Sequence, residues 1–504
     1  MNTSVSLRSL DPSRPGVQTV ETHVSTLVFD GERVHKRKKP VRFPFIDLST
    51  RELRRQACER DVALNRRFSP DVYLGVEDVV DDAGTIVDYA VLMCRLPAER
   101  RLATLLRERR DVSQCLRAVA RTMADYHARS APTDEICSVA TPEALHDLWA
   151  ENLGELSTFV PQPIDPAMLT TIEQLAHRYL DGRSALLGER IANGRIVDGH
   201  GDLLAEDIFC LDDGPRILDG LEFDERLRWG DVLYDVGFLA MDLERLGRLD
   251  LARAFLNWYR EYSAETHPSS LEDHYVAYRA LVRSKISCLR GGPDDLVDSQ
   301  TYLALCHRHL LDARVRLVVI GGLPGTGKST LAAALGDELA WPVLRSDEVR
   351  KELAGRDPLE PAPAAYRHGL YSPGMTETTY DALVAQARLL LARGHSVILD
   401  ASFSEARWRT RAAAIAAECS ADLLEVRCLL PAHLAAGRVA TRAAAGDDPS
   451  DANAVVAAEM ADTFDCWPSA TTVETLPPVA ELVPALLGRI EAAPTTSVSG
   501  NGEQ

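Results

Sequence analysis

The sequence predicts an α/β protein of several domains, in which a two-lobed α+β region precedes a doubly wound parallel sheet. The first observation is an apolar, β-branched run at residues 316–320, which leads through a glycine-rich turn into a helical pattern. The second is length, because residues 1–312 are far more than this sheet needs. The third is a change within those residues, from strand-like patterns before about residue 100 to helical patterns after it.

Composition and pattern also divide the chain. The polar first residues, which include Pro12 and Pro15, and the small polar residues at the end predict disordered termini. A change from helical to strand period after Leu311 indicates a boundary between two domains. We therefore expect a disordered N-terminus at residues 1–20, a first domain at 21–312 with a small lobe at about 21–97 and a large lobe at about 98–312, a second domain at 313–491, and a disordered tail at 492–504.

The small lobe begins with a β-rich stretch. Residues 26–29 and 33–36 predict two strands joined by a turn at residues 30–32. Residues 49–67 carry helix-favouring charges, and residues 89–93 predict another buried strand. A sheet with one helix is therefore expected ahead of the helical lobe.

One motif fits the pattern G-x-x-x-x-G-K-[ST] at every fixed position, and its residues are Gly322-Leu323-Pro324-Gly325-Thr326-Gly327-Lys328-Ser329. The strand before it and the helix opening at Thr330 supply the context that a phosphate-binding loop requires. We therefore expect ATP as the ligand, with residues 322–330 around its phosphates. Lys328 would neutralise the β and γ phosphates, and Ser329 would hold Mg²⁺.

Two further strands of this region end in acids. Residues 395–400 form an apolar strand pattern that ends at Asp400, the position expected of a second Mg²⁺-anchoring group. Residues 342–347 end at Asp347, with Arg350 one helical turn beyond. Since the carboxyl ends of parallel strands face the ligand crevice, Asp347 could accept the proton of an acceptor hydroxyl while Arg350 binds the substrate. The alternatives are a structural acid at Asp400 and a helix N-cap at Asp347.

Arg438 and Arg442 stand four residues apart in a helix predicted after Pro431, so they project from one face. They could form a lid that contacts the transferring phosphoryl group, as catalytic residues. Ordinary surface arginines are the alternative.

A second group of candidate residues surrounds His200-Gly201-Asp202, with Asp207 and Asp219 farther along the chain. Two short apolar runs, at residues 207–211 and 216–218, predict a hairpin between these acids. Carboxylates that converge on one pocket are what phosphoryl transfer requires, because one orients the acceptor hydroxyl and others hold Mg²⁺. An acid-rich turn beside a helix is the alternative.

These residues resemble the aminoglycoside phosphotransferase family, relatives of the protein kinases, whose signature is H-G-D-x-x-x-x-N followed by a second aspartate. The resemblance implies that Asp202 is the catalytic base and that Asp219 is a Mg²⁺ ligand. A later segment containing Gly230, Asp231 and Asp235 also looks like the family's G-D-x-x-x-D segment, which supports the loop. Asp207 stands where the family has Asn; its carboxylate can still bind a hard cation, but it adds a negative charge.

The kinase scheme implied by this resemblance also needs a lysine that contacts ATP, paired with an acid on the following helix. Lys36 is the first candidate, with Lys38 and Lys39 as alternatives, and a solvated basic run is a further alternative. The helix partner could be Glu59 or Asp61. By resemblance, residues 93–96 would contact the adenine. No G-x-G-x-x-G pattern appears near the N-terminus of the sequence.

Residues 315–490 resemble the P-loop kinases of the gluconate kinase, zeta toxin and polynucleotide kinase type. The order of the two parts resembles bacterial proteins described as bifunctional aminoglycoside phosphotransferase and ATP-binding proteins, and this resemblance covers nearly the whole chain. It implies a protein-kinase-like first domain and an ATP- and Mg²⁺-dependent transfer to the hydroxyl of a small molecule. The alternative is that a degenerate first domain regulates the P-loop domain.

Composition bounds the partners and the location. The 504 residues carry a net charge of −19, which argues against nucleic acid as the main partner. An acidic rim could suit a cationic amino sugar, or could be a solvated loop; its residues are Glu206, Asp207, Glu222, Asp224 and Glu225. The ten scattered cysteines indicate reduced packing residues, and no apolar run predicts secretion or a membrane span. We expect a cytoplasmic protein; the sequence does not predict its oligomeric state.

Overall fold

A computed structural model of the chain describes residues 4–11, 17–22, 24–43, 46–357, 359, 360, 367–445, 450 and 454–492. The chain divides into two compact units. The first comprises Met1–Glu173, Leu187–His267 and Glu272–His309, and the second comprises Gln174–Leu186, Pro268–Leu271 and Leu310–Gln504. The second unit therefore includes two short segments from the middle of the predicted first domain.

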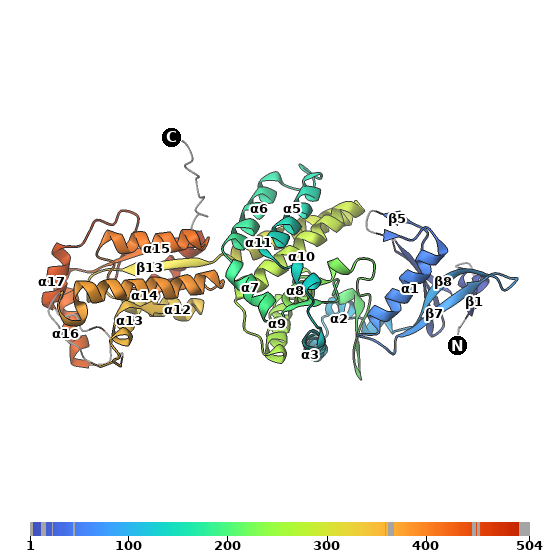
Figure 1. Cartoon of the computed structure of the whole chain (residues 1–504), viewed down its shortest axis with the longest axis horizontal. Coiled ribbons are helices and arrows are strands. Elements are labelled where there is room, and N and C mark those ends of the chain that lie inside the picture. The colour runs from blue at the N-terminus through green and yellow to red at the C-terminus, as the bar shows by residue number, and fades with distance from the viewer. Residues whose placement is uncertain are drawn as a thin grey trace. The chain divides into compact units, whose positions relative to one another are not determined.

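The small lobe of the first unit is a six-stranded sheet in the order β1-β7-β8-β4-β3-β2. Figure 1 labels its strands β1, β7 and β8. Helix α1 (Arg51–Asn65) packs on it and shares a core with Val34, Val91 and Met93. Only β1 and β7 run parallel; the other neighbours are antiparallel. The strands are β1 (Ser4–Ser6), β2 (Gln18–Glu21), β3 (Ser25–Asp30), β4 (Arg33–Lys38), β7 (Tyr73–Val80) and β8 (Ile86–Cys94), with the short pair β5 (Arg42–Phe43) and β6 (Ile46–Asp47).

The prediction that residues 1–20 are disordered is wrong for the part of them that the structure describes. Strand β1 pairs with β7, and β2 pairs with β3. Main-chain hydrogen bonds to the two edges of a sheet need no apolar side chains, so the polar sequence gave no sign of them. The predicted tail lies outside the described residues, except for Ala492 at the end of the last helix.

The large lobe is helical, as predicted, and carries the predicted hairpin. Strands β10 (Ile208–Leu211) and β11 (Gly214–Ile217) are antiparallel, and a second small pair joins β9 (Ile196–Asp198) to β12 (Trp229–Asp231). The helices are α2 (Leu102–Arg107), α3 (Ser113–Arg129), α4 (Asp134–Ser138), α5 (Pro142–Ser157), α6 (Pro166–Asp181), α7 (Ser184–Ala192), α8 (Val232–Arg245), α9 (Leu249–Ser263), α10 (Ser269–Arg290) and α11 (Pro293–Asp312).

Two cysteines correct the prediction that all ten are reduced packing residues. Cys115 on α3 and Cys210 on β10 form a disulfide, with their Cα atoms 5.6 Å apart. They are 95 residues apart in the sequence, so no spacing rule indicates the pair. The cysteines therefore give no argument for a reducing compartment. Among the described residues, no helix is both long enough and apolar enough to cross a membrane.

The second unit is built on a five-stranded parallel sheet in the order β14-β15-β13-β16-β17. Residues Leu317 to Ile320 of the middle strand are completely buried, so both faces of the sheet are covered. Helices α12 and α18 share a core with Val318 and Ile320, whereas α14 and α15 pack against each other. The elements are β13 (Arg316–Gly321), α12 (Lys328–Leu339), β14 (Val343–Arg345), α13 (Ser346–Leu353), α14 (Pro373–Ala392), β15 (Val397–Asp400), α15 (Ala406–Glu418), β16 (Asp422–Leu429), α16 (Ala432–Ala445), α17 (Ala454–Asp462), β17 (Thr471–Glu474) and α18 (Val479–Ala492).

The burial of β13 allows a prediction about the free energy of unfolding of the second unit. Replacing Ile320 with Ala would remove buried methyl groups and leave a cavity, at a cost of about 2–5 kcal/mol to the free energy of unfolding of the second unit. Hydrogen exchange of β13 peptides in increasing urea would measure this. Leu353→Ala, on the exposed surface of α13, is the control and should change the same free energy by less than about 0.5 kcal/mol. Equal effects of the two variants would contradict the described core.

Candidate functional sites

The P-loop joins β13 to α12 through a turn that requires glycine. Gly322, Gly325 and Gly327 have φ angles of 145°, 80° and 81°, in the region that L side chains rarely adopt. A Cβ atom at Gly322 would lie 2.6 Å from the carbonyl oxygen of Cys428, and one at Gly325 would lie 2.4 Å from that of Ala435. The backbone therefore closes tightly at the start of α12, where free N–H groups favour an anion.

Lys328 and Ser329 begin α12, and Asp400 ends β15 beside them. Asp400 is 3% exposed, and burial raises the pKa of its carboxyl group, although Lys328 and Ser329 partly oppose this. Its Oδ2 accepts a hydrogen bond from Arg345 Nε at 3.3 Å, whereas its buried Oδ1 has no hydrogen-bond partner among the described residues. An unpartnered carboxylate oxygen next to a hydroxyl fits Mg²⁺, which prefers oxygen ligands.

A cavity of about 100 Å³, partly open to solvent, adjoins the P-loop. Asp347 lies in the first turn of α13, whose N-cap is Arg345, so Asp347 is not the N-cap. Arg350, one turn further along, is 5% exposed and donates to the carbonyl of Leu370 at 3.1 Å. Lys328, Asp347 and Arg350 all line this cavity, together with Arg367, Tyr371, Tyr380, Arg407 and Trp408.

Among the described residues, no carboxylate pairs with the guanidinium of Arg350. Its Nε is buried without a hydrogen-bond partner, and its charge is placed 4.7 Å from the centre of the Tyr371 ring. A buried cation without an acid is costly, so this side chain favours a ligand that carries negative charge.

Of the two lid candidates, Arg438 and Arg442, the structure describes the side chain of Arg438. Arg438 on α16 donates from Nη2 to the carbonyl of Thr475 at 2.9 Å, and its guanidinium lies 3.1 Å from where a Cβ of Gly327 would be. It is therefore next to the P-loop. Arg442 belongs to the same helix, but its side chain lies outside the described residues.

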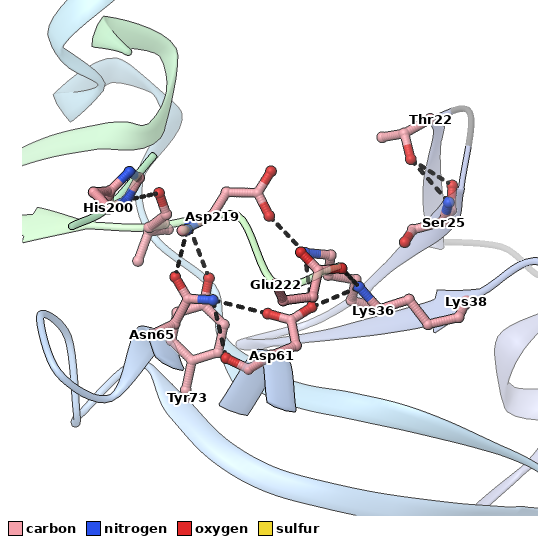
Figure 2. A network of polar contacts seen from close by, with 12 residues as sticks. Thr22, Ser25, Lys36, Lys38, Asp61, Asn65, Tyr73, His200, Asp219 and Glu222 are labelled. Atoms are coloured by element: carbon pink, nitrogen blue, oxygen red, sulfur yellow. Dashed lines mark hydrogen bonds and ion pairs between the residues drawn. The ribbon is translucent and has the colours of Figure 1, made fainter. Parts of the chain in front are cut away.

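The first unit contains a second cluster of charges (Figure 2). Lys36 on β4 reaches Asp61 on α1 and Asp219 after β11, with Nζ–O distances of 2.9 and 2.6 Å. Of the two possible helix partners, the structure therefore places Asp61 beside Lys36, whereas Glu59 is exposed and pairs with Arg55. Burial raises the pKa of Asp61, but Lys36 and Lys38 outweigh this and lower it to about 2.

The other two candidate lysines lie elsewhere. Lys38 is completely buried and pairs with Asp61 at 2.8 Å and with Glu222. Lys39 donates to the carbonyl of Thr22 at 2.6 Å and pairs with Glu21. Of the three lysines, Lys36 is the one whose ion pairs join it to Asp219.

The backbone around Asp219 is fixed by side chains that the sequence did not single out. Asp219 has a φ of 62°, and its N–H donates to the hydroxyl of Tyr73 at 3.1 Å. The N–H of Gly220 donates to Asn65 Oδ1 at 2.8 Å. An amide at the end of a charged helix looks like an ordinary C-terminal residue, so only the fold reveals this role of Asn65.

Asp235 supports the loop that carries Asp202, which agrees with the role implied by the family resemblance. It accepts hydrogen bonds from the N–H groups of His200 and Gly201 at 2.8 and 2.9 Å, and it lies 3.1 Å from His127 Nε2. Although burial raises the pKa of Asp235, these partners lower it on balance. The loop before β10 is therefore anchored on a carboxylate that stays ionised.

Three carboxylates gather at this site. Burial raises the pKa of Asp202, and burial together with the charges of Asp219 and Asp202 raises the pKa of Asp207 well above its usual range. Like charges this close repel one another unless a cation binds. Asp202, Asp207 and Asp219 thus lie close enough for their charges to interact, and Lys36 pairs with Asp219, but the three carboxylates do not bring their oxygen atoms within 4.8 Å of one another.

The two units have distinct folds: the first has a β-rich small lobe and a helical large lobe, and the second is a P-loop α/β domain, as predicted. Residues 317–466 match the family described as an AAA domain. The chain is 38% identical over 467 residues to the Uncharacterized protein Rv2004c of Mycobacterium tuberculosis, covering 92% of this chain and 93% of that protein. The Uncharacterized protein Mb2027c of Mycobacterium bovis matches to the same extent. The chain belongs to the family that includes these two proteins.

Two solved structures each match a part of this chain. A choline/ethanolamine kinase family protein from Mesorhizobium loti is 12% identical, with a TM-score of 0.38, over 61% of this chain and 97% of that chain. A putative kinase from Chloroflexus aurantiacus is 20% identical, with a TM-score of 0.29, over 34% of this chain and 97% of that chain. At these values, the likeness carries no conclusion about activity.

The ion pairs of Asp61 with Lys36 and Lys38 predict how Asp61→Asn changes the free energy of unfolding. Asp61→Asn would leave two buried ammonium groups short of negative charge, at a cost of about 3 kcal/mol to the free energy of unfolding at neutral pH. Because the pKa of Asp61 is lowered, its stabilising contribution is present above pH 3.8 and is lost as the pH falls through about 2. The gap between wild type and variant should therefore narrow below pH 4.

Urea unfolding followed by circular dichroism between pH 2.5 and 7 would measure this gap. Glu59→Gln is the matched control, because Glu59 lies on the same helix but is exposed. A pH-independent gap, or an equal loss in the control, would contradict the described network.

Proposed function

We propose that the chain is an ATP- and Mg²⁺-dependent phosphotransferase that transfers the γ-phosphoryl group to the hydroxyl of a small molecule. The observation that carries this proposal is the shared cavity of Lys328, Asp347 and Arg350 beside a glycine-dependent P-loop. A phosphate site alone fits any nucleotide-binding protein. A carboxylate and a buried arginine on the acceptor side of the loop favour a kinase.

The side chains divide the work of transfer. Lys328 would neutralise the β and γ phosphates, and Ser329 and Asp400 would hold Mg²⁺, which shields the phosphate charge. Asp347 would accept the proton of the acceptor hydroxyl, and Arg350 would bind an anionic part of the acceptor. Arg438, next to Gly327, would contact the transferring group, and we extend the same role to Arg442.

The first unit would hold a second phosphotransfer site. Lys36 would contact ATP phosphates, Asp202 would be the base, and Asp219 and Asp207 would hold Mg²⁺. The preassembled contacts of Lys36 with Asp61 and Asp219 support this role. A cytoplasmic location is part of this proposal.

A second candidate function is that the first unit binds nucleotide without transfer and regulates the P-loop unit. Asp207 favours it, because burial and the charges of Asp219 and Asp202 raise its pKa, so that ionising it as a Mg²⁺ ligand is costly.

The P-loop lysine gives the first test of activity. Lys328→Ala should reduce transfer from labelled ATP by at least about 100-fold at the second unit, because the charge that stabilises the β and γ phosphates is lost. A panel of sugars, nucleosides and aminoglycosides would be the acceptors. Lys351→Ala is no suitable control because Lys351 is buried; Lys285→Ala, outside both sites, should leave turnover unchanged.

Residual turnover in the Lys328→Ala chain would be assigned to the first unit if Asp202→Asn then removes it. Turnover that is unaffected by Lys328→Ala and by both substitutions together would contradict the proposal for either site.

Asp207 distinguishes the two candidate functions of the first unit. In a Lys328→Ala chain, Asp207→Asn should lower the KM for ATP by about tenfold if the unit is a working catalyst, because an amide replaces a carboxyl group that is costly to ionise when Mg²⁺ and ATP bind. Initial rates at varied ATP would measure it. Tighter binding of a nonhydrolysable ATP analogue, with no transfer by either variant, would instead favour the regulatory function.

A further inference from the structure

Two arginines of α10 lie near Asp202, on the side of the large lobe. Arg279 and Arg283 are four residues apart and so share one face of the helix. Arg283 Nη1 lies 4.0 Å from Asp202 Oδ1, which is too long for a hydrogen bond, and the Asp202 side chain is 35% exposed. The proposed base is therefore half-buried beside a guanidinium that does not hydrogen-bond to it.

In the part of the chain that the structure describes, Arg279 lacks a carboxylate partner, and both arginines have buried nitrogen atoms without hydrogen-bond partners. Arg279 is 3% exposed; it donates from Nε to the carbonyl of Tyr234 at 2.8 Å, its guanidinium stacks on the Tyr234 ring, and no carboxylate pairs with it among the described residues. Its Nη2 and the Nε of Arg283 are buried without hydrogen-bond partners. Aromatic rings compensate only part of the cost of a buried cation.

Asp242, a buried acid on α8, already accepts hydrogen bonds from other groups. Asp242 accepts hydrogen bonds from the N–H of Ala205 at 3.0 Å and from Arg245 Nε at 2.9 Å. Among the residues that the structure describes, Arg279 therefore has no acid of its own, because Asp242 is bonded to Arg245 and Asp202 lies 4.0 Å from Arg283.

Two of the acids that could bind a cationic amino sugar are neutralised instead. Glu206 pairs with Arg101 at 3.3 Å and with Arg107. Glu222 pairs with the buried Lys38. These two residues of the acidic rim therefore do not present free negative charge to an acceptor.

We propose that the acceptor of the first unit carries an oxyanion, a carboxylate, phosphate or sulfate, near its reacting hydroxyl, and that Arg283 binds this group. Arg279 is a positioning residue, which adds positive potential behind Arg283. In the transfer, the hydroxyl oxygen forms a bond to the γ-phosphorus, the bond from that phosphorus to ADP breaks, and the proton passes to Asp202. The inference rests on the phosphotransferase function proposed for this unit.

The test uses the full chain with Lys328→Ala, so that turnover comes from the first unit. Matched acceptors would be a neutral sugar, its phosphate, its carboxylic acid and its amino derivative, with labelled ATP. The expected result is transfer to an anionic member, and an increase of at least tenfold in its KM on Arg283→Gln, with the KM for ATP unchanged. Arg283→Lys should recover part of the loss. Arg290→Gln, at the exposed end of the same helix, is the control and should match the parent chain.

A binding measurement keeps the inference separate from turnover. Equilibrium dialysis with labelled sulfate should find one bound sulfate fewer per chain in Arg283→Gln than in Arg290→Gln. No transfer together with this difference would refute the catalytic function and retain the oxyanion site. Equal sulfate binding by the two variants, or transfer that prefers the amino derivative, would overturn the inference.

Discussion

The carboxylate of Asp61 lies between two buried lysines, and the first unit's site depends on this arrangement. Lys36 extends from it to Asp219, and Lys38 extends from it to Glu222, so helix α1, strand β4 and the segment after β11 meet at one buried group. Two buried ammonium groups would be too costly without nearby acids. The same charges that stabilise the lobe therefore also position Lys36, the proposed phosphate ligand, next to Asp219, the proposed metal ligand.

The second unit places the charged and polar groups of its site in a different way. Its charges lie at the carboxyl ends of parallel strands, where β13 leads into the P-loop and β15 ends at Asp400. Main-chain N–H groups at the start of α12 replace many of the side-chain cations that the first unit uses. In both units, a buried oxygen or nitrogen atom without a partner marks the place where a ligand is expected, at Asp400 and Arg350 in one and at Arg279 in the other.

Local patterns allowed the P-loop to be predicted, because its strand, glycines and helix are consecutive in the sequence. The hairpin between Asp202 and Asp219 was equally local. Partners distant in sequence could not be predicted. Asp61 and Glu59 lie on one helix and were equivalent candidates, and only the fold shows that Asp61 faces Lys36. The same holds for the disulfide of Cys115, whose partner is 95 residues away. The arginines of α10 were missed because only burial distinguishes them from ordinary helical arginines.

The central claim is that one chain has two sites for Mg²⁺ and ATP, on unrelated folds. Isothermal titration of the full chain with a nonhydrolysable ATP analogue in the presence of Mg²⁺ tests it most directly. Two molecules should bind per chain, with one lost in Lys328→Ala and the other in Lys36→Ala. Binding of a single molecule, abolished by Lys328→Ala and unaffected by Lys36→Ala, would contradict the account of the first unit, and no binding would contradict both.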